Sequence, residues 1–283
     1  MSAYRERTYT SQDNLRLFFR DYGDPLAPLS PVLCLPGLTR NCKDFATLAD
    51  RLSRSRRVVC PDYRGRGRSD HDPYWRNYTP STYLADIHHL LAAAGLDQVV
   101  VIGTSLGGLL GMALAVWAPK ALPGLVLNDI GPQIEPAEQH RLLTLISVDA
   151  PQPNWDAAVA ALRDMFPGLA FRQEATWMTM AKNTWRQGDD GKLHFDWDVR
   201  LARPMLRGTE ALPDPWRLYG ALRHIPVLAL RGENSSVLSK KCFDRMAALK
   251  PDLARVTVAG TAHTPDLNEP EAETAIDDFL RRI

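Results

Sequence analysis

The sequence feature that most restricts the fold is a glycine-rich turn between an apolar strand and an apolar helix. Residues 98–102 predict a buried strand, and Gly103-Thr104-Ser105-Leu106-Gly107-Gly108 follows it directly, ahead of the apolar stretch LLGMALAVWA. A serine on so sharp a turn needs glycine two residues away on either side, because a Cβ there would collide with the crossing strand and helix. A plain glycine-rich turn is the alternative. The flanking strand and helix favour an exposed Ser105 as a candidate nucleophile.

The helix that starts at Leu106 would stabilise negative charge beside Ser105. Its first N–H groups have no partner within the helix, and its positive dipole end faces the serine. Acyl transfer passes through a tetrahedral oxyanion, which calls for a second backbone donor from a neighbouring strand end. The loop at residues 35–40, Leu-Pro-Gly-Leu-Thr-Arg, suits this need. We therefore expect the N–H groups of Leu38 and Leu106 to form an oxyanion hole, although an ordinary strand-ending turn would explain the loop equally well.

A serine nucleophile also needs a base within hydrogen-bond reach. His263 is the candidate, because it lies in a loop of small residues, 259–263, between the last predicted strand and the closing helix. Such a loop can bring an imidazole to the carboxyl edge of the sheet, where the sites of open α/β sheets gather. The remaining histidines are expected to be structural or solvated: His71, His88, His89, His140, His194 and His224.

Alternating strand and helix patterns predict an α/β fold. The apolar runs expected to be strands are 14–20, 32–35, 58–60, 98–102, 124–128, 226–231 and 254–258. Residues 80–94 predict a crossover helix that stops at Gly95, and 269–282 predict a closing helix. The later strands are apolar throughout, as in strands buried on both faces. The pattern predicts a mostly parallel central sheet of about eight strands, flanked by helices, whose first strands run antiparallel.

The strand rhythm is interrupted after the sixth strand. Residues 132–220 contain no convincing buried strand and several amphipathic helical stretches. We expect this segment to be a helical cap inserted into a core domain formed by residues 1–131 and 221–283. Which of its residues line a pocket is not readable from the sequence.

The amino-acid composition indicates which kind of molecule the protein binds. Hydrophobic residues make up 45% of the chain and charged residues 24%, which is typical of a globular protein. The 34 Lys and Arg residues nearly balance 33 Asp and Glu residues, so no strong field attracts nucleic acid or an anionic membrane. We expect a small-molecule substrate. The oligomeric state stays open.

Neither a signal peptide nor a bilayer-spanning run is evident, so a cytoplasmic location is expected. The four cysteines show no metal-ligand spacing, and no metal or organic cofactor is implied. Cys34 and Cys60, which end apolar runs, are expected to be buried thiols.

Taken together, the nucleophile turn and the histidine loop resemble the α/β-hydrolase superfamily, in its capped branch of esterases, lactonases and carbon–carbon bond hydrolases. The resemblance covers nearly the whole chain. The stretch 61–69, Pro-Asp-Tyr-Arg-Gly-Arg-Gly-Arg-Ser, is similar to the family's loop after the fourth strand, in which Asp62 and the glycines would serve structure. Many relatives have His-Gly where this chain has Pro36-Gly37. Because the donor in that loop is a backbone group, this difference need not harm catalysis.

A second departure concerns the acid of the triad. Relatives usually carry it in a Gly-Glu-x-x-Asp pattern, but here Ser236 stands where the aspartate is expected. A neutral hydroxyl can hold the imidazole tautomer but cannot stabilise the imidazolium. Asp129, at the end of the sixth strand, is the best substitute and keeps the chain order nucleophile, acid, base. It could instead serve only to cap the strand. Glu233 and Asp266 are weaker candidates.

Three functions are compatible with these residues. The leading hypothesis is a serine hydrolase that cleaves an ester or a related carbonyl compound through an acyl-serine intermediate. A lactonase or a carbon–carbon bond hydrolase would use the same site. A ligand-binding pseudo-hydrolase that lacks the acid belongs to another class, because a fold does not fix a function. Relatives that are epoxide hydrolases or haloalkane dehalogenases carry aspartate as nucleophile, so Ser105 argues against both.

Overall fold

An eight-stranded sheet forms the centre of the protein, whose computed structural model describes residues 4–166, 169, 173–208 and 214–283. The strand order is β1-β2-β4-β3-β5-β6-β9-β10. The first two strands join antiparallel, β2 pairs antiparallel with β4, and the remaining pairs are parallel. The predicted α/β fold with a mostly parallel sheet is therefore confirmed. The strands are β1 (Tyr4–Thr10), β2 (Arg16–Tyr22), β3 (Val32–Leu35), β4 (Val58–Pro61), β5 (Val100–Thr104), β6 (Gly124–Asn128), β9 (Val227–Gly232) and β10 (Ala254–Val258).

Strand β1 was not among the expected strands. Its sequence, YRERTYT, carries mostly polar side chains, and only Tyr9 among them is buried. The strand lies at the edge of the sheet, where one side of its backbone and most of its side chains stay in water. An edge strand of this kind lacks the apolar pattern that marks the strands next to it.

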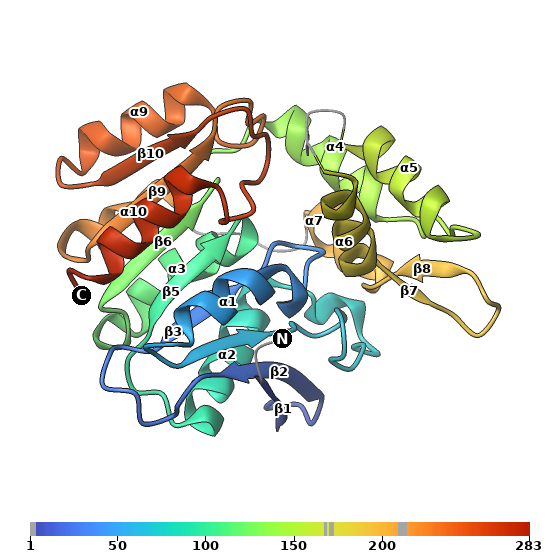
Figure 1. Cartoon of the computed structure of the whole chain (residues 1–283), viewed down its shortest axis with the longest axis horizontal. Helices are drawn as coiled ribbons and strands as arrows, with labels where there is room; N and C mark the ends of the chain where they lie inside the picture. Colours follow the sequence, from blue (N-terminus) through green and yellow to red (C-terminus); the bar gives the residue numbers. More distant parts are fainter. Residues whose placement is uncertain (1–3, 167–168, 170–172, 209–213) are drawn as a thin grey trace.

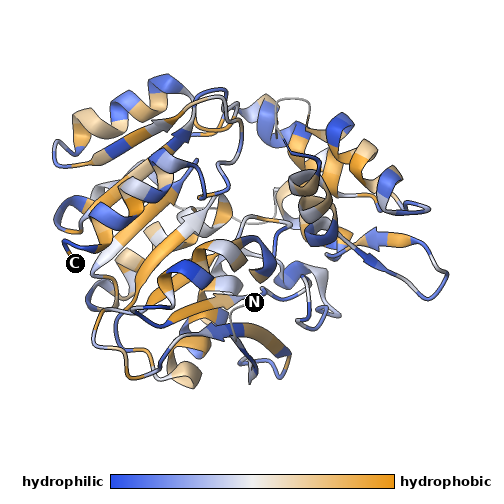
Figure 2. Cartoon of the chain, viewed as in Figure 1, coloured by the Kyte–Doolittle hydropathy of each residue, from blue (hydrophilic) through white to orange (hydrophobic). Residues whose placement is uncertain are grey.

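Helices cover both faces of the sheet, as Figure 1 shows. Alternate residues of β3 point into two cores: Leu33 and Leu35 into one, Val32 and Cys34 into the other. Helices α1 (Ala46–Leu52) and α10 (Pro270–Leu280) close the second core. The first core is closed by α2 (Pro80–Ala94), α3 (Leu106–Trp117) and α9 (Lys240–Leu249). Figure 2 shows the apolar residues concentrated in the central strands, with polar residues on the outer sides of α1 and α10.

The crossover helix α2 begins and ends where the sequence predicts. Thr79 accepts a hydrogen bond from the N–H of Thr82, and Pro80 occupies the first turn. Gly95 ends the helix with φ of 63°, a left-handed conformation that glycine adopts without a Cβ penalty.

The segment between β6 and β9 lies at the end of the sheet where the parallel strands finish (Figure 1). Its elements are α4 (Pro136–Ile146), α5 (Trp155–Met165), α6 (Glu174–Thr184), β7 (Trp185–Gln187), β8 (Leu193–Phe195), α7 (Arg203–Leu206) and α8 (Pro215–Gly220). Residues 167–168, 170–172 and 209–213 of this segment lie outside the described part. Short 3₁₀ turns occur at Cys42–Phe45, Trp75–Asn77, Pro119–Ala121, Val199–Ala202 and Ala221–His224.

The expectation that 132–220 holds no buried strand was wrong. Strands β7 and β8 pair antiparallel, and Trp185 packs on Phe195 with both side chains buried. Phe195 in turn stacks on Trp197 with a centroid distance of 4.0 Å. Strands of three residues are too short to show a period in the sequence, which is why the hairpin could not be recognised. The division of the chain into core and cap stays a prediction.

Several polar contacts join the segment between β6 and β9 to a loop of the sheet. Arg40 Nη1 donates to Thr184 Oγ1 at 2.6 Å, and Lys43 Nζ lies 2.9 Å from Asp196 Oδ2. The buried Asn41 side chain donates to the Asn183 carbonyl at 2.9 Å. These contacts join the loop after β3 to the α6–β8 part of the segment.

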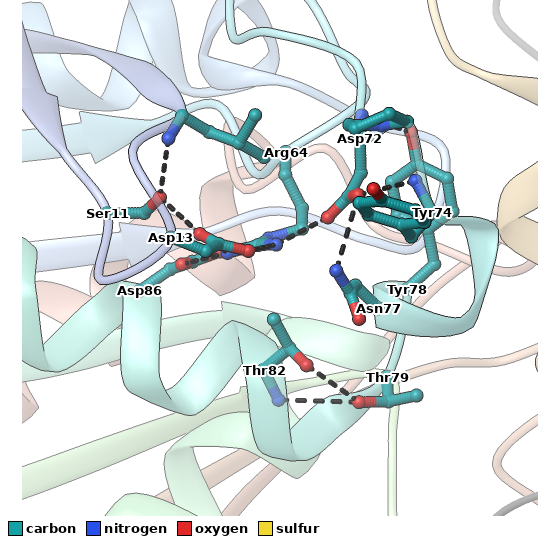
Figure 3. Close-up of polar contacts among 12 residues, drawn as sticks. Ser11, Asp13, Arg64, Asp72, Tyr74, Asn77, Tyr78, Thr79, Thr82 and Asp86 are labelled. Atoms are coloured by element: carbon teal, nitrogen blue, oxygen red, sulfur yellow. Dashed lines mark hydrogen bonds and ion pairs between the residues drawn. The ribbon is translucent and has the colours of Figure 1, made fainter.

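A buried arginine fixes the loop that follows β4. Arg64 is fully buried and pairs with Asp13 at 2.7 Å and with Asp72 and Asp86 at 2.6 Å each (Figure 3). Its hydrogen bonds lower the pKa of Asp13, while burial raises the pKa of Asp86. The cluster joins the β1–β2 turn, the loop after β4 and helix α2. In the same loop Asp62 accepts from the N–H groups of Cys42 and Arg68, which is the structural role expected for it.

Candidate active site

Ser105 occupies a strained turn between β5 and α3. Its φ is 51° and its ψ is −114°, a combination that few non-glycine residues adopt. A Cβ on Gly103 would lie 2.5 Å from the Gly108 nitrogen, and one on Gly107 would lie 2.6 Å from the Leu35 carbonyl carbon. Both glycines are therefore required by the close approach of backbone, as the sequence predicts.

The loop after β3 lies beside Ser105. A Cβ built on Gly37 would stand 3.8 Å from the Ser105 Cβ, so the backbone of this loop borders the serine. The Gly37 carbonyl accepts from the Arg40 N–H at 3.1 Å. Because N–H and C=O point in opposite directions across a trans peptide, the Leu38 N–H points away from Arg40. Within the described residues this N–H donates to no protein acceptor, as an oxyanion-hole donor requires.

Two side chains hold the backbone carbonyls of this loop. The Tyr63 hydroxyl donates to the Pro36 carbonyl at 3.2 Å, and Arg66 Nε donates to the Leu38 carbonyl at 2.8 Å. Arg66 is fully buried, with its guanidinium 4.8 Å from the centroid of the Tyr83 ring. Leu106, the other expected donor, is the first residue of α3, where helix N–H groups have no partner in their own helix.

The structure brings His263 and Asp129 together. His263 Nδ1 lies 2.7 Å from Asp129 Oδ2, although the two residues are 134 positions apart in the chain. Asp129 follows β6 directly, has φ of 53° and is fully buried. The His263 side chain is 17% exposed, so part of the ring is open to solvent while Nδ1 contacts the buried carboxylate.

Three donors surround the Asp129 carboxylate. The Gly232 N–H donates to Oδ1 at 2.8 Å, and the Ser235 hydroxyl donates to Oδ2 at 2.5 Å. His263 Nδ1 shares Oδ2 with that hydroxyl. A buried carboxylate costs little only when such donors replace its water. The set also favours the His263 tautomer with hydrogen on Nδ1, which leaves Nε2 free to accept a proton.

Asn128 connects the serine turn with the histidine loop. Its carbonyl accepts from the Ser105 N–H at 3.0 Å. Its side-chain amide donates to the Pro265 carbonyl at 2.9 Å and to Thr104 Oγ1 at 3.1 Å. The residue before Ser105 and the segment just after His263 are thus held by one buried side chain.

The other candidate acids make different contacts. Ser236 donates to Glu138 Oε1 of α4 at 2.9 Å, and hydrogen bonds from Arg141 lower the pKa of Glu138. Glu233 Oε2 accepts from the Gly260 N–H at 2.8 Å, and Asp266 Oδ1 accepts from the Asn268 N–H at 2.8 Å. Among the described hydrogen bonds, only Asp129 connects a carboxylate to His263.

Sequence reasoning missed the residues that hold the acid. Ser235 and Asn128 lie next to the two candidate positions for the acid, Ser236 and Asp129, yet nothing in their spacing reveals a contact. For Asn128 the only signal is a polar side chain at the end of the otherwise apolar β6, and for Ser235 it is a polar side chain in the loop after β9. Gly232 contributes a backbone N–H, which no side-chain pattern encodes.

The described residues hold no group of three or more His, Cys, Asp or Glu side chains placed to bind a metal ion. All four cysteines are free and buried. None of the described helices combines the length and the apolar character needed to cross a bilayer.

Known proteins resemble this chain over most of its length. Residues 30–270 match the family described as alpha/beta hydrolase fold. The chain is 32% identical to a 3-hydroxybutyrate-oligomer hydrolase of Cupriavidus necator over 271 residues, covering 92% of this chain and 91% of that protein. It is 26% identical to a 2-(acetamidomethylene)succinate hydrolase of Mesorhizobium japonicum, covering 88% and 87%.

A crystal structure of an alpha/beta hydrolase from Novosphingobium aromaticivorans DSM 12444 superposes with a TM-score of 0.92 and is 40% identical, with all of both chains covered.

Proposed function

We propose, from the premise that this chain belongs to the alpha/beta hydrolase fold family, that it is a serine hydrolase which cleaves an ester or related carbonyl compound. In this proposal Ser105 is the nucleophile, His263 the general base and Asp129 the acid. The observation that carries it is the 2.7 Å contact between His263 Nδ1 and Asp129 Oδ2. That contact supplies the carboxylate whose absence from position 236 left the triad incomplete.

The reaction would proceed in two halves. His263 Nε2 takes the Ser105 hydroxyl proton as Oγ attacks the carbonyl carbon, and the oxyanion accepts from the N–H groups of Leu38 and Leu106. Collapse of the tetrahedral intermediate breaks the bond to the leaving group, which receives the proton from His263. Water then attacks the acyl-serine with His263 again as base, and the acid product leaves with Ser105 restored. Asp129 stabilises the imidazolium in both halves.

The relatives support an ester or a related carbonyl compound as the substrate. One is named for hydrolysis of 3-hydroxybutyrate oligomers and another for hydrolysis of 2-(acetamidomethylene)succinate. The first matches this chain over more than nine-tenths of both proteins, which favours an ester of a small hydroxy acid among the possible substrates. Residues 132–220 would act as the cap that shapes the pocket for it. A lactone or a carbon–carbon bond substrate would use the same residues.

Labelling by a fluorophosphonate probe tests the nucleophile. The wild type should be labelled at Ser105, identified by mass spectrometry of the peptide, and Ser105→Ala should lose both the label and esterase activity. Ser55→Ala, which removes an exposed serine after α1, is the matched control and should keep both. An unlabelled, folded wild type would contradict the proposal and favour a ligand-binding pseudo-hydrolase.

A substrate panel then separates the reaction classes. Short oligomers of 3-hydroxybutyrate, a lactone and a vinylogous diketone would be compared by kcat/KM. We expect the oligomeric ester to be the best of the three. A diketone that exceeded it would assign carbon–carbon bond hydrolysis to the same triad.

A further inference from the structure

The end of β9 and the loop that follows it, residues 232–236, contact both oxygens of the acid of the proposed triad. In the family this loop resembles, position 236 usually carries the acid itself. Here the loop instead provides two of the donors to Asp129: the Gly232 N–H on Oδ1 and the Ser235 hydroxyl on Oδ2. The loop therefore surrounds a carboxylate that arrives from another strand.

The Ser235 hydroxyl has its orientation fixed by its neighbours. Its oxygen accepts from the N–H groups of Val237 at 3.2 Å and Leu238 at 3.0 Å. A hydroxyl has two acceptor positions and one donor position, so these contacts leave only its proton for Asp129. An ionised carboxylate can only accept. The 2.5 Å contact is thus a charge-assisted hydrogen bond with one possible direction, and it lies in a buried site.

We propose that Ser235 is a positioning residue of the site: its hydroxyl holds the Asp129 carboxylate in line with His263 Nδ1 and shares its charge. This rests on the proposed function for its catalytic consequence. Because Ser235 and His263 contact the same oxygen, Oδ2, the hydroxyl fixes where that oxygen stands relative to the ring. The hydroxyl also stabilises the negative charge on Oδ2, whose other described partner is His263 Nδ1.

The hydrogen bond from Ser235 to Asp129 affects the expected pH profile of the reaction. The Asp129–His263 pair carries a net charge of −1 when the imidazole is neutral and zero when it is protonated. Removing a donor from Oδ2 destabilises the −1 state more than the neutral one. Without the Ser235 hydroxyl the pair would therefore keep its proton to higher pH, and the acid limb of kcat/KM would move upward. A residue needed only to fold the loop would not move that limb.

Ionisable side chains on the elements that adjoin the pair must be the same in every variant compared, and one of them, Glu138, interacts electrostatically with His263. They are Glu138 and Arg141 of α4, Glu233 after β9, and Asp266 and Glu269 of the segment after His263. None of the described contacts of these five side chains involves Ser235. Substitutions at Ser235 thus change the hydroxyl while leaving these charges in place.

The test compares three variants with the wild type by pH–rate profiles on a chromogenic ester. Ser235→Ala should lower kcat by about ten- to a hundredfold, the effect of one lost hydrogen bond to a charged group, and should shift the acid limb to higher pH. Ser235→Thr, which keeps a hydroxyl, should restore the limb. Ser236→Ala is the matched control: it removes the neighbouring hydroxyl, which contacts Glu138 and not Asp129, and should keep the wild-type limb.

A second measurement separates this inference from the proposed function. In a Ser105→Ala background, the low-field Nδ1–H proton of His263 is followed by NMR with and without Ser235→Ala. A change in its chemical shift supports the contact even if the wild type hydrolyses no ester. Should Ser235→Ala fail to fold, Ser235→Cys carries the same test, because a thiol fills the site but donates weakly. If Ser235→Ala is active but leaves both the acid limb of kcat/KM and the His263 resonance unchanged, the proposed role of Ser235 is overturned while the proposed function stands.

Discussion

Replacement of Asp129 by asparagine tests the proposed triad most directly, because each orientation of the new amide conflicts with one of the contacts that the carboxylate makes. With the amide oxygen at the Oδ1 position, the NH₂ group faces His263 Nδ1 and the Ser235 hydroxyl. His263 must then accept at Nδ1 and carry its proton on Nε2, which is the wrong tautomer for a base. With the amide reversed, NH₂ faces the Gly232 N–H, and two donors oppose each other in a buried site.

The size of the loss follows from these two conflicts. The reversed amide keeps the tautomer but costs about 1–3 kcal/mol for a buried unsatisfied donor, and it still removes the charge that stabilises the imidazolium. The first orientation gives the wrong tautomer, for which a drop in kcat of about 10⁴-fold is the known scale in a serine triad. That corresponds to about 5.4 kcal/mol in the activation barrier. We therefore expect Asp129→Asn to lower kcat by about 10²- to 10⁴-fold.

The assay is steady-state hydrolysis of a chromogenic short-chain ester, with circular dichroism to verify folding. Asp266→Asn and Glu233→Gln are the controls, because each removes another candidate carboxylate, and the new amide oxygen can still accept the backbone N–H that the carboxylate bound. Both should stay within about twofold of the wild type. If Asp129→Asn keeps full activity while Ser236→Asp raises it, the reasoning about the acid is refuted.

Two further predictions concern stability. Gly107→Ala should lower the free energy of unfolding in urea by about 3 kcal/mol or more, because the new Cβ would overlap the Leu35 backbone. Gly95→Ala has nothing within 4 Å of its Cβ and should cost only about 1 kcal/mol, because of its left-handed φ. Equal losses in the two variants would contradict the steric argument. Burial, followed by the charge of Asp266, raises the pKa of Glu269 from 4.5 to about 7, so its contribution to stability is present below pH 4.5 and is lost as pH rises through 7. Glu269→Gln should therefore gain stability relative to the wild type between pH 5 and pH 8 in thermal melts, and a constant difference would count against this shift.

The sequence was sufficient for the central sheet because buried parallel strands leave a continuous apolar signal. The runs at β3, β4, β5, β6 and β9 are mostly apolar and are bounded by Gly, Pro or Asp, whereas the edge strand β10 alternates apolar with polar residues. The helix at 80–94 carries its own start and stop residues. Strand β1 and the β7–β8 hairpin could not be recognised in the sequence, because their burial depends on tertiary neighbours. Strand β1 is an exposed edge strand, and β7 and β8 have only three residues each.

For the candidate site, the sequence identified the residues whose chemistry requires a particular local backbone. Ser105 needs flanking glycines, and His263 needs a loop at the end of a strand. The sequence could not decide between Asp129 and the other candidate acids, because the choice depends on which strand ends meet. That depends on the order of strands in the sheet. The donors that surround it, from Gly232 and Ser235, belong to a third segment and could be found only by seeing the strands β6 and β9 side by side.

Asn128 and Asp129 are consecutive, and between them they contact the serine turn, the loop that follows His263, and His263 itself. When two distant segments are positioned by separate supports, small displacements of each support add together. Here the serine turn and the histidine loop are both held by the same two residues at the end of β6. A displacement of β6 therefore moves the serine and the imidazole in the same direction. Their mutual alignment is thereby insulated from distortions that arise elsewhere in the sheet.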